Sequence, residues 1–233
     1  MPEKTLTCKL FAKSPYSSRE ERADFCYREY RDHFGDSVLD VCGYRGGIGR
    51  VFPGKYVNVD MDSQADYCLN LDTVERLPFP DAAFDTVVCT DGLEHLENIH
   101  RVFDEICRVA GKSVLISLPN AWTNAAVILG GLRAQFSRSR PRRLPDRHWT
   151  LPVDKPADRH RWFYSLSEAD EMIRARGKRA GFTVTRYDAH VIVPPGFSFT
   201  RVVRALHRAI WTEEDFANLY AWVGWWGLTK EGR

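Results

Sequence analysis

Apolar and amphipathic segments alternate along this chain in the order typical of an α/β protein. Runs of about four to eight apolar residues favour strands that are covered on both faces. Such runs predict strands at residues 37–42, 56–60, 84–90, 113–119 and 182–193, with weaker ones at 65–71 and 222–229. The alternation of these strands with helices predicts a mostly parallel sheet with helices on both faces.

Helical periodicity is clearest in three segments. Residues 17–34 begin with a Ser/Glu capping box, and residues 93–109 repeat apolar positions at helical spacing up to Gly111. A third helix is predicted to begin at another capping box, at Ser165, and to stop at Gly181. The tail that follows is predicted to add one or two helices before the last strand.

A proline- and arginine-rich stretch at residues 130–160 interrupts this alternation and predicts a long loop or lid. No linker that would separate two domains is evident. We therefore expect residues 1–35 to form an N-terminal helix or cap. Residues 36–233 are expected to form one domain with a lid insertion at about 125–165.

Composition and charge narrow the class of protein. The chain has 233 residues and a net charge of +2. The charges are unevenly distributed: residues 60–105 hold twelve acidic and two basic residues, whereas residues 106–233 hold twenty-one basic and eleven acidic ones. No apolar run reaches the roughly eighteen residues of a transmembrane helix, and the N-terminus lacks the apolar core of a secretory signal. The six cysteines are scattered singly, so we expect a reduced, cytoplasmic protein with no metal site.

A glycine cluster follows the first predicted strand of the sheet, in the segment VLDVCGYRGGIGR (38–50). Ligands of open parallel sheets bind at the carboxyl ends of strands, and glycine lets a ligand approach the backbone closely. Asp60 ends the next strand, where a carboxylate is placed to bind the hydroxyls of a ribose. The glycine spacing differs from the dinucleotide pattern, because Arg45 and Phe52 stand where that pattern needs glycine. A nucleoside-type ligand is thus predicted, although the glycines alone are also compatible with a plain loop.

Four blocks in this order resemble class I S-adenosylmethionine-dependent methyltransferases. They are VLDVCGYRGGIG, VNVDMD, RLPFPDAAFDTVVCTDGLEHLENIHRVFDEICRV and VLISLPN. The resemblance covers about residues 36–120 and extends more weakly towards residue 190. It implies a single Rossmann-like domain with a seven-stranded sheet, S-adenosylmethionine as cofactor and S-adenosylhomocysteine as product. It departs from the family at Cys42 and Tyr44, where glycine is usual.

The resemblance also implies roles for individual residues. Asp40 would lie near the methionine ammonium, Asp60 would hold the ribose diol, and Met61 and Asp72 would lie at the adenine. The full set implied for the cofactor is Asp40, Gly43, Gly46, Gly47, Asp60, Met61, Asp72, Thr90, Asp91, Gly92 and His95.

Candidates for the acceptor side lie in and beside the lid, where DRHW (146–149) is nearly repeated as DRHRW (158–162). An oxygen or nitrogen acceptor can require a base to remove its proton. His160 is the first candidate for a base or substrate-positioning residue, followed by His148 and Tyr164. The alternative is that these side chains only pack the lid and form its salt bridges.

The arginines of residues 133–147 favour an anionic or phosphorylated acceptor, and basic residues among aromatic ones are also typical of RNA binding. We therefore expect O-methylation of a small molecule or glycan, in a biosynthetic role. The alternatives are an RNA methyltransferase and a non-catalytic Rossmann-like binding module. The basic, apolar tail suggests a sheet-covering helix, a homodimer contact or contact with an anionic membrane surface.

Overall fold

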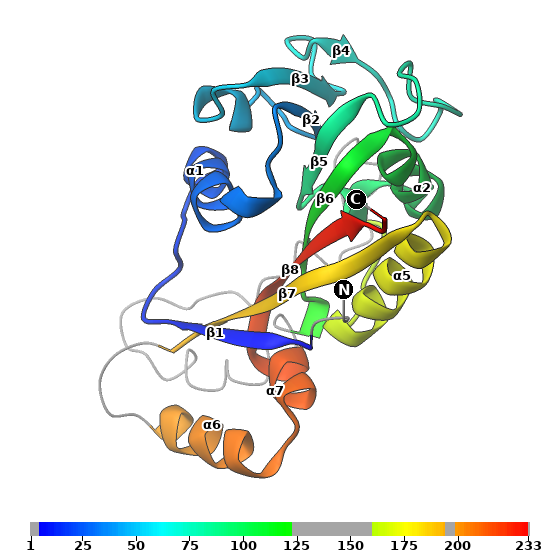
Figure 1. The fold of residues 1–233 in the computed structure, drawn as a ribbon. Helices are drawn as coiled ribbons and strands as arrows, with labels where there is room; N and C mark the ends of the chain where they lie inside the picture. The colour runs from blue at the N-terminus through cyan, green and yellow to red at the C-terminus, as the bar shows by residue number, and fades with distance from the viewer. Residues whose placement is uncertain (1–4, 123–159, 194–198, 233) are drawn as a thin grey trace, which may run out of the picture.

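The computed structural model of this chain describes residues 5–122, 160–193 and 199–232. Its centre is a mixed eight-stranded sheet of strand order β1-β7-β8-β6-β5-β2-β3-β4 (Figure 1). The strands are β1 (Thr7–Phe11), β2 (Ser37–Val41), β3 (Lys55–Asp60), β4 (Tyr67–Cys68), β5 (Phe84–Thr90), β6 (Ala110–Pro119), β7 (Phe182–Ile192) and β8 (Ala221–Lys230). The helices are α1 (Arg19–Glu29), α2 (Ile99–Val109), α5 (Leu166–Arg179), α6 (Phe199–Ile210) and α7 (Glu213–Tyr220), with short 3₁₀ turns η1 (Arg31–His33), η2 (Ile48–Arg50) and η3 (Leu93–His95).

The predicted α/β class is confirmed, with one strand more than the seven expected. Neighbouring strands from β6 to β4 are parallel, as are β1 and β7, whereas β8 runs antiparallel to both β6 and β7. The additional strand is β1, which pairs with β7 at one edge of the sheet. Its sequence, TCKLF, is too short and too polar to stand out as a strand.

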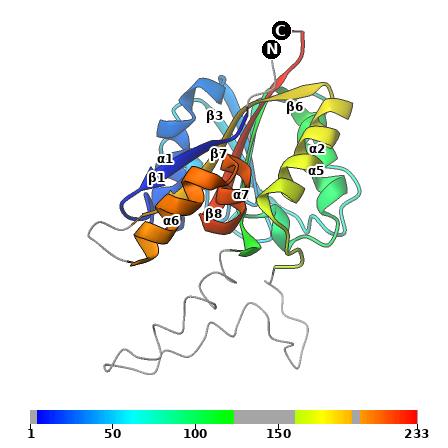
Figure 2. The same cartoon turned by 90° about the horizontal axis from the view of Figure 1, so that it is seen from below.

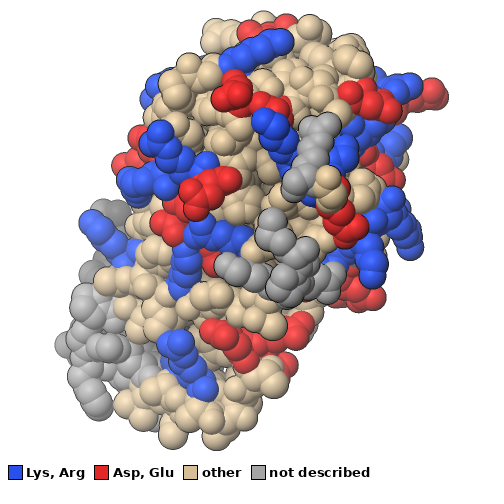
Figure 3. Space-filling view, in the orientation of Figure 1, with Lys and Arg blue, Asp and Glu red and all other residues tan. Residues whose placement is uncertain are grey.

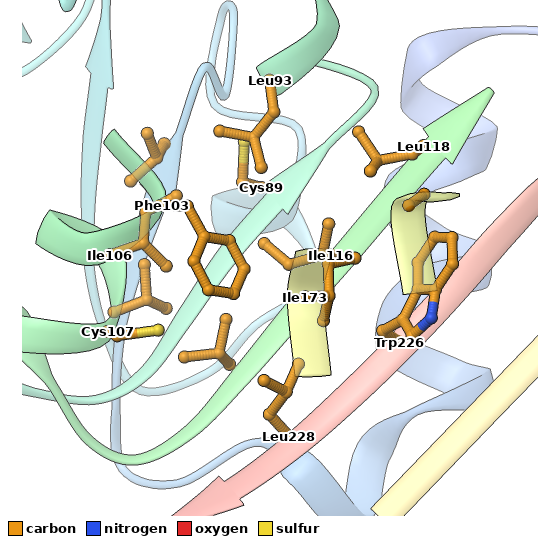
Figure 4. Packing of buried hydrophobic residues seen from close by; sticks show 14 of the residues in the cluster. Cys89, Leu93, Phe103, Ile106, Cys107, Ile116, Leu118, Ile173, Trp226 and Leu228 are labelled. Carbon is orange, nitrogen blue, oxygen red and sulfur yellow. The ribbon is translucent and has the colours of Figure 1, made fainter. Parts of the chain in front are cut away.

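Helices cover both faces of the sheet, as predicted. Helices α2 and α5 lie on one face and α1 on the other (Figures 1 and 2). Because side chains of a strand alternate between the two faces, β5 directs Val87 and Cys89 to the α2 side and Val88 to the α1 side. Figure 4 shows the core on the α2 side, where residues of α2 and α5 meet those of β6 and β8.

Two adjacent tryptophans of β8 pack against the layers on the two faces of the sheet. Trp225 stacks on Tyr30 with ring centroids 5.0 Å apart, and Trp226 stacks on Tyr187 at 4.8 Å. Both indoles are fully buried, on opposite faces of the sheet. These tryptophans of the basic C-terminal part therefore stabilise the core.

The helix predicted at residues 93–109 is shorter than expected. Residues Leu93–His95 form the 3₁₀ turn η3, Leu96 is extended, and α2 begins only at Ile99. Leu93 and Leu96 are both buried, so the apolar positions serve the core without a continuous helix. Gly111 does not end the helix but lies inside β6, because Ala110 already pairs with Phe84 of β5.

Side-chain capping explains where α1 and α5 begin. The side chain of Ser18 accepts a hydrogen bond from the backbone N–H of Glu21, whose carboxylate accepts one from Ser17. The predicted box of Ser165 and Glu168 is complete and starts α5, and Gly181, with φ of +79°, follows its end.

Most of the predicted lid, together with the basic segment 133–147, lies outside the described residues.

The surface carries mixed charges. In Figure 3, Lys and Arg are interspersed with Asp and Glu, and the area over α6 is largely uncharged. Helix α6 exposes Leu206 and Ile210. Among the described residues, no helix combines the length and apolar character needed to cross a bilayer. Contact of this tail with a membrane surface or a second copy stays a prediction.

Candidate functional site

A cavity of about 1110 Å³ lies at the carboxyl ends of β2, β3 and β5. Helix α1, the turn η3 and the segment at His160 complete its wall. Ten of the eleven residues implied for the cofactor line it, and Gly46 is the exception; the ten are Asp40, Gly43, Gly47, Asp60, Met61, Asp72, Thr90, Asp91, Gly92 and His95. The sheet thus brings these residues together from the ends of β2, β3 and β5 and from the loop after β4.

The loop after β2 is tightly wound. Cys42 and Tyr44 have φ angles of +58° and +34°, in the left-handed region that favours glycine. A Cβ on Gly43 would lie 2.5 Å from Cγ of Asp40 and 2.6 Å from Oδ1 of Asn58. The sequence departs from the glycine-rich pattern at Cys42 and Tyr44, yet the backbone keeps the conformation that glycine would adopt.

The ring of Tyr44 contacts two cationic side chains. The guanidinium of Arg19 lies 4.4 Å from the centre of the Tyr44 ring and that of Arg45 lies 5.2 Å away. The backbone N–H of Tyr44 donates a 2.9 Å hydrogen bond to Oδ2 of Asp60. This contact fixes the glycine loop to the end of β3.

Asp40 is a buried carboxyl at the end of β2. Its Oδ2 accepts a 2.9 Å hydrogen bond from the hydroxyl of Tyr56. Burial raises the pKa of Asp40 to about 7, against the opposing effects of Tyr56 and the Arg22 guanidinium. A cationic ligand group beside Asp40 would favour its charged form and lower that pKa again.

Asp91 stands at the end of β5 with a φ angle of +46°. Its Oδ1 accepts a 2.6 Å hydrogen bond from Ser117, and its Oδ2 is paired with Arg22 of α1. Next to it, a Cβ on Gly92 would lie 2.5 Å from Cβ of Cys42, so only glycine lets the two loops meet. Sequence reasoning missed Arg22, because nothing local indicates that α1 reaches the end of β5.

The far wall of the cavity is more open. Met61 lines it with 57% of its surface exposed. Asp72 accepts a 3.0 Å hydrogen bond from the backbone N–H of Asn98, which ties the loop after β4 to the start of α2. Met61 and Asp72 both line this wall of the cavity.

The acceptor candidates differ in position. His160 lines the cavity, Tyr164 does not, and His148 lies outside the described residues. Burial raises the pKa of the Tyr164 phenol well above its usual range, so Tyr164 stays protonated at neutral pH. Of the three, His160 is the side chain that the described structure places at the cavity.

His160 is held against η3 by backbone contacts. The N–H of Arg161 donates a 2.7 Å hydrogen bond to the carbonyl of Glu94, and the indole of Trp162 donates one of 2.7 Å to the carbonyl of Leu96. Nε2 of His160 lies 4.0 Å from Oε1 of the buried Glu94. Sequence reasoning also missed Glu94, an acid inside the motif LEHL whose burial no local pattern reveals.

Comparison with known proteins gives a match to one family model. Residues 50–116 match the family model described as a methyltransferase domain. A search among curated protein sequences gives no match.

Three solved structures illustrate the likeness in fold. A SAM-dependent methyltransferase from Archaeoglobus fulgidus is 14% identical, with a TM-score of 0.52 over 91% of this chain and 95% of that one. Magnesium protoporphyrin IX methyltransferase from Synechocystis PCC 6803, solved with bound SAH, is 11% identical, with a TM-score of 0.50 over 91% and 83%. The small RNA methyltransferase HEN1 is 14% identical, with a TM-score of 0.54 over 92% of this chain and 25% of that one. At these identities the likeness concerns the fold.

Proposed function

We propose that this chain is a class I S-adenosylmethionine-dependent methyltransferase that methylates a small-molecule or glycan acceptor, with oxygen as the favoured acceptor atom. The observation that carries the proposal is one cavity that is lined both by the residues implied for the cofactor and by His160. Its volume, about 1110 Å³, suits a cofactor together with a small acceptor.

The bound cofactor supplies a methyl group on a sulfonium, which an acceptor lone pair attacks in line while the carbon–sulfur bond breaks. The residues of this chain bind and orient the two partners. Asp40 and Asp91 place carboxyl groups near the positive charges of the methionine part, and Asp60 binds the ribose diol. His160 positions the acceptor hydroxyl and accepts its proton, so that the attacking oxygen gains negative charge and the methylated oxygen of the product is neutral.

Binding of S-adenosylhomocysteine tests the cofactor part. We expect micromolar affinity by calorimetry, and Asp60→Asn to weaken it about tenfold or more, because a charge-assisted contact to the ribose is lost. Asp81→Asn is the matched control, since Asp81 is an exposed acid outside the cavity. No binding by the unchanged protein would overturn the proposal.

Turnover tests the acceptor part. Formation of S-adenosylhomocysteine is measured with hydroxylated small molecules, glycans and a short RNA. His160→Ala is expected to lower turnover at least about a hundredfold while it leaves the affinity for S-adenosylhomocysteine unchanged. Turnover on the RNA alone would replace the proposed acceptor by the nucleic-acid alternative.

We also propose a cytoplasmic location, which six unbridged cysteines support.

A further inference from the structure

Three side chains that could bind a metal ion meet in the wall of the cavity. Glu94, His95 and His160 each offer one ligand atom, and these atoms all lie within 4.8 Å of one another. Oε1 of Glu94 is 3.6 Å from Nε2 of His95 and 4.0 Å from Nε2 of His160. Two ligand atoms on one ion, each about 2.1 Å from it, are separated by about 3–3.5 Å at tetrahedral or octahedral angles. Small side-chain rotations therefore suffice to close the set around an ion.

We propose that Glu94, His95 and His160 bind one divalent transition-metal ion at the edge of the cavity. Two imidazoles and one carboxylate form a donor set that suits ions such as Zn²⁺ or Mn²⁺. A set of three protein ligands leaves coordination positions open for a substrate. Sequence patterns predict no metal here, because His160 lies far along the chain from the other two ligands.

Burial supports the assignment. The side chain of Glu94 is only 1% exposed, so its carboxylate is held inside the protein at the wall of the cavity. The imidazoles of His95 and His160 are 30% and 28% exposed, and both line the cavity. An ion held by the three would thus be anchored on the protein side and reachable from the cavity.

The backbone holds the three ligands in place before any ion binds. Glu94 and His95 are adjacent in η3, and the N–H of His95 donates a 3.2 Å hydrogen bond to the carbonyl of Gly92. The bond from Arg161 to the carbonyl of Glu94 attaches His160 to the same turn. The rings of His95 and His160 meet edge to face with centroids 4.6 Å apart. Such prior ordering lowers the entropic cost of binding.

The role of the ion rests on the methyl transfer proposed above, although metal binding itself does not. η3 follows directly after Asp91 at the end of β5, so the ion would lie beside the residues assigned to the methyl-donor part of the cofactor. An acceptor hydroxyl bound to the ion has a lowered pKa and releases its proton to water. Its oxygen then forms the bond to the methyl carbon as the carbon–sulfur electron pair returns to sulfur. With the ion bound, His160 would serve as its ligand and water would accept the proton; in the metal-free protein His160 keeps the role of proton acceptor proposed above.

Titration of the untagged, chelator-treated protein with Zn²⁺, Mn²⁺ and Co²⁺ tests the inference. We expect one equivalent of at least one of these ions to bind, and visible absorption bands on Co²⁺ addition. His160→Ala and Glu94→Gln should each weaken binding at least about tenfold. His207→Ala, which removes an imidazole from α6 outside the cavity, should bind like the unchanged protein.

The outcomes separate this inference from the proposed function. Absence of saturable binding, or binding that survives both ligand variants, would overturn the metal site. Affinity for S-adenosylhomocysteine is measured on the same metal-free protein, so a failed metal titration with intact cofactor binding leaves the methyltransferase proposal standing. Because Glu94 is buried, circular dichroism checks that Glu94→Gln is folded, and the part-exposed His160 provides the variant that is least disruptive to the core.

Discussion

At the scale of single residues, the site depends on a backbone that comes unusually close to buried side chains. The glycine loop combines left-handed residues at Cys42 and Tyr44 with a glycine that packs directly on Asp40. A left-handed conformation costs a residue with a side chain roughly 1 kcal/mol. The loop keeps this geometry because the surrounding contacts hold it, in particular the bond from Tyr44 to Asp60.

Gly43→Ala should therefore weaken cofactor binding by more than the loss of protein stability accounts for. Its new Cβ would overlap Asp40 and Asn58, and the loop would have to move away from the cavity floor. We expect affinity for S-adenosylhomocysteine to fall at least about tenfold, measured by calorimetry. Gly181→Ala is the control, because Gly181 has a φ of +79° but open space around it at the end of α5. That variant should lose about 1 kcal/mol of stability and keep its affinity; equal affinities in the two variants would contradict the close-packing argument.

At the scale of elements, helix α1 belongs to the site as well as to the fold. Its capping serine and its buried face were predictable, because both are encoded within a few residues. Its contact with Asp91 was not, since that ion pair joins positions far apart in sequence. The same limit explains η3, where the periodic Leu93 and Leu96 are buried as predicted but the helix between them does not form.

Arg22→Met should destabilise the protein and weaken cofactor binding together. The side chains of Arg22 and Asp91 are 17% and 19% exposed, so loss of the guanidinium leaves a largely buried carboxylate without its cation. We expect about 2 kcal/mol of lost stability in urea denaturation. The control is Arg50→Met, whose partner Asp24 lies 3.7 Å away with both side chains about half exposed. That variant should change stability by less than about 0.5 kcal/mol; equal losses in both would show that the Arg22 pair contributes nothing specific.

At the scale of the whole molecule, the sequence predicted the sheet better than the acceptor side. Apolar runs and their order are local signals that survive into the fold, so seven of the eight strands are found near their expected positions. Register and crossovers then bring Asp40, Asp60 and Asp91 to the wall of one cavity. The triplet of Glu94, His95 and His160 arises only from the fold, because His160 lies far along the chain from the adjacent Glu94 and His95.

Two buried groups in separate parts of the molecule should give opposite pH dependence of stability. Burial raises the pKa of Asp40 to about 7 and lowers that of His190 to about 4. The folded state thus holds a proton on Asp40 that the unfolded chain releases near pH 4, so this group's contribution to stability falls as pH rises from about 4 to 7. His190 is neutral in the fold but binds a proton below about pH 6.5 in the unfolded chain, so its contribution is lost as pH falls from about 6.5 to 4.

Single variants should separate the two effects, which largely cancel in the unchanged protein. Free energies of unfolding are measured in urea at pH 4.5, 5.5, 6.5 and 7.5, a range chosen to span about the two titrations. Relative to the unchanged protein, Asp40→Asn should gain stability with rising pH, by up to about 4 kcal/mol across the window. His190→Phe, which keeps a ring against Phe11 and Trp225, should gain stability with falling pH, by up to about 3 kcal/mol. If the stability difference between each variant and the unchanged protein stays constant with pH, neither group titrates as its burial requires. If the two stability differences change with pH in the same direction, one of the two groups is charged in the fold.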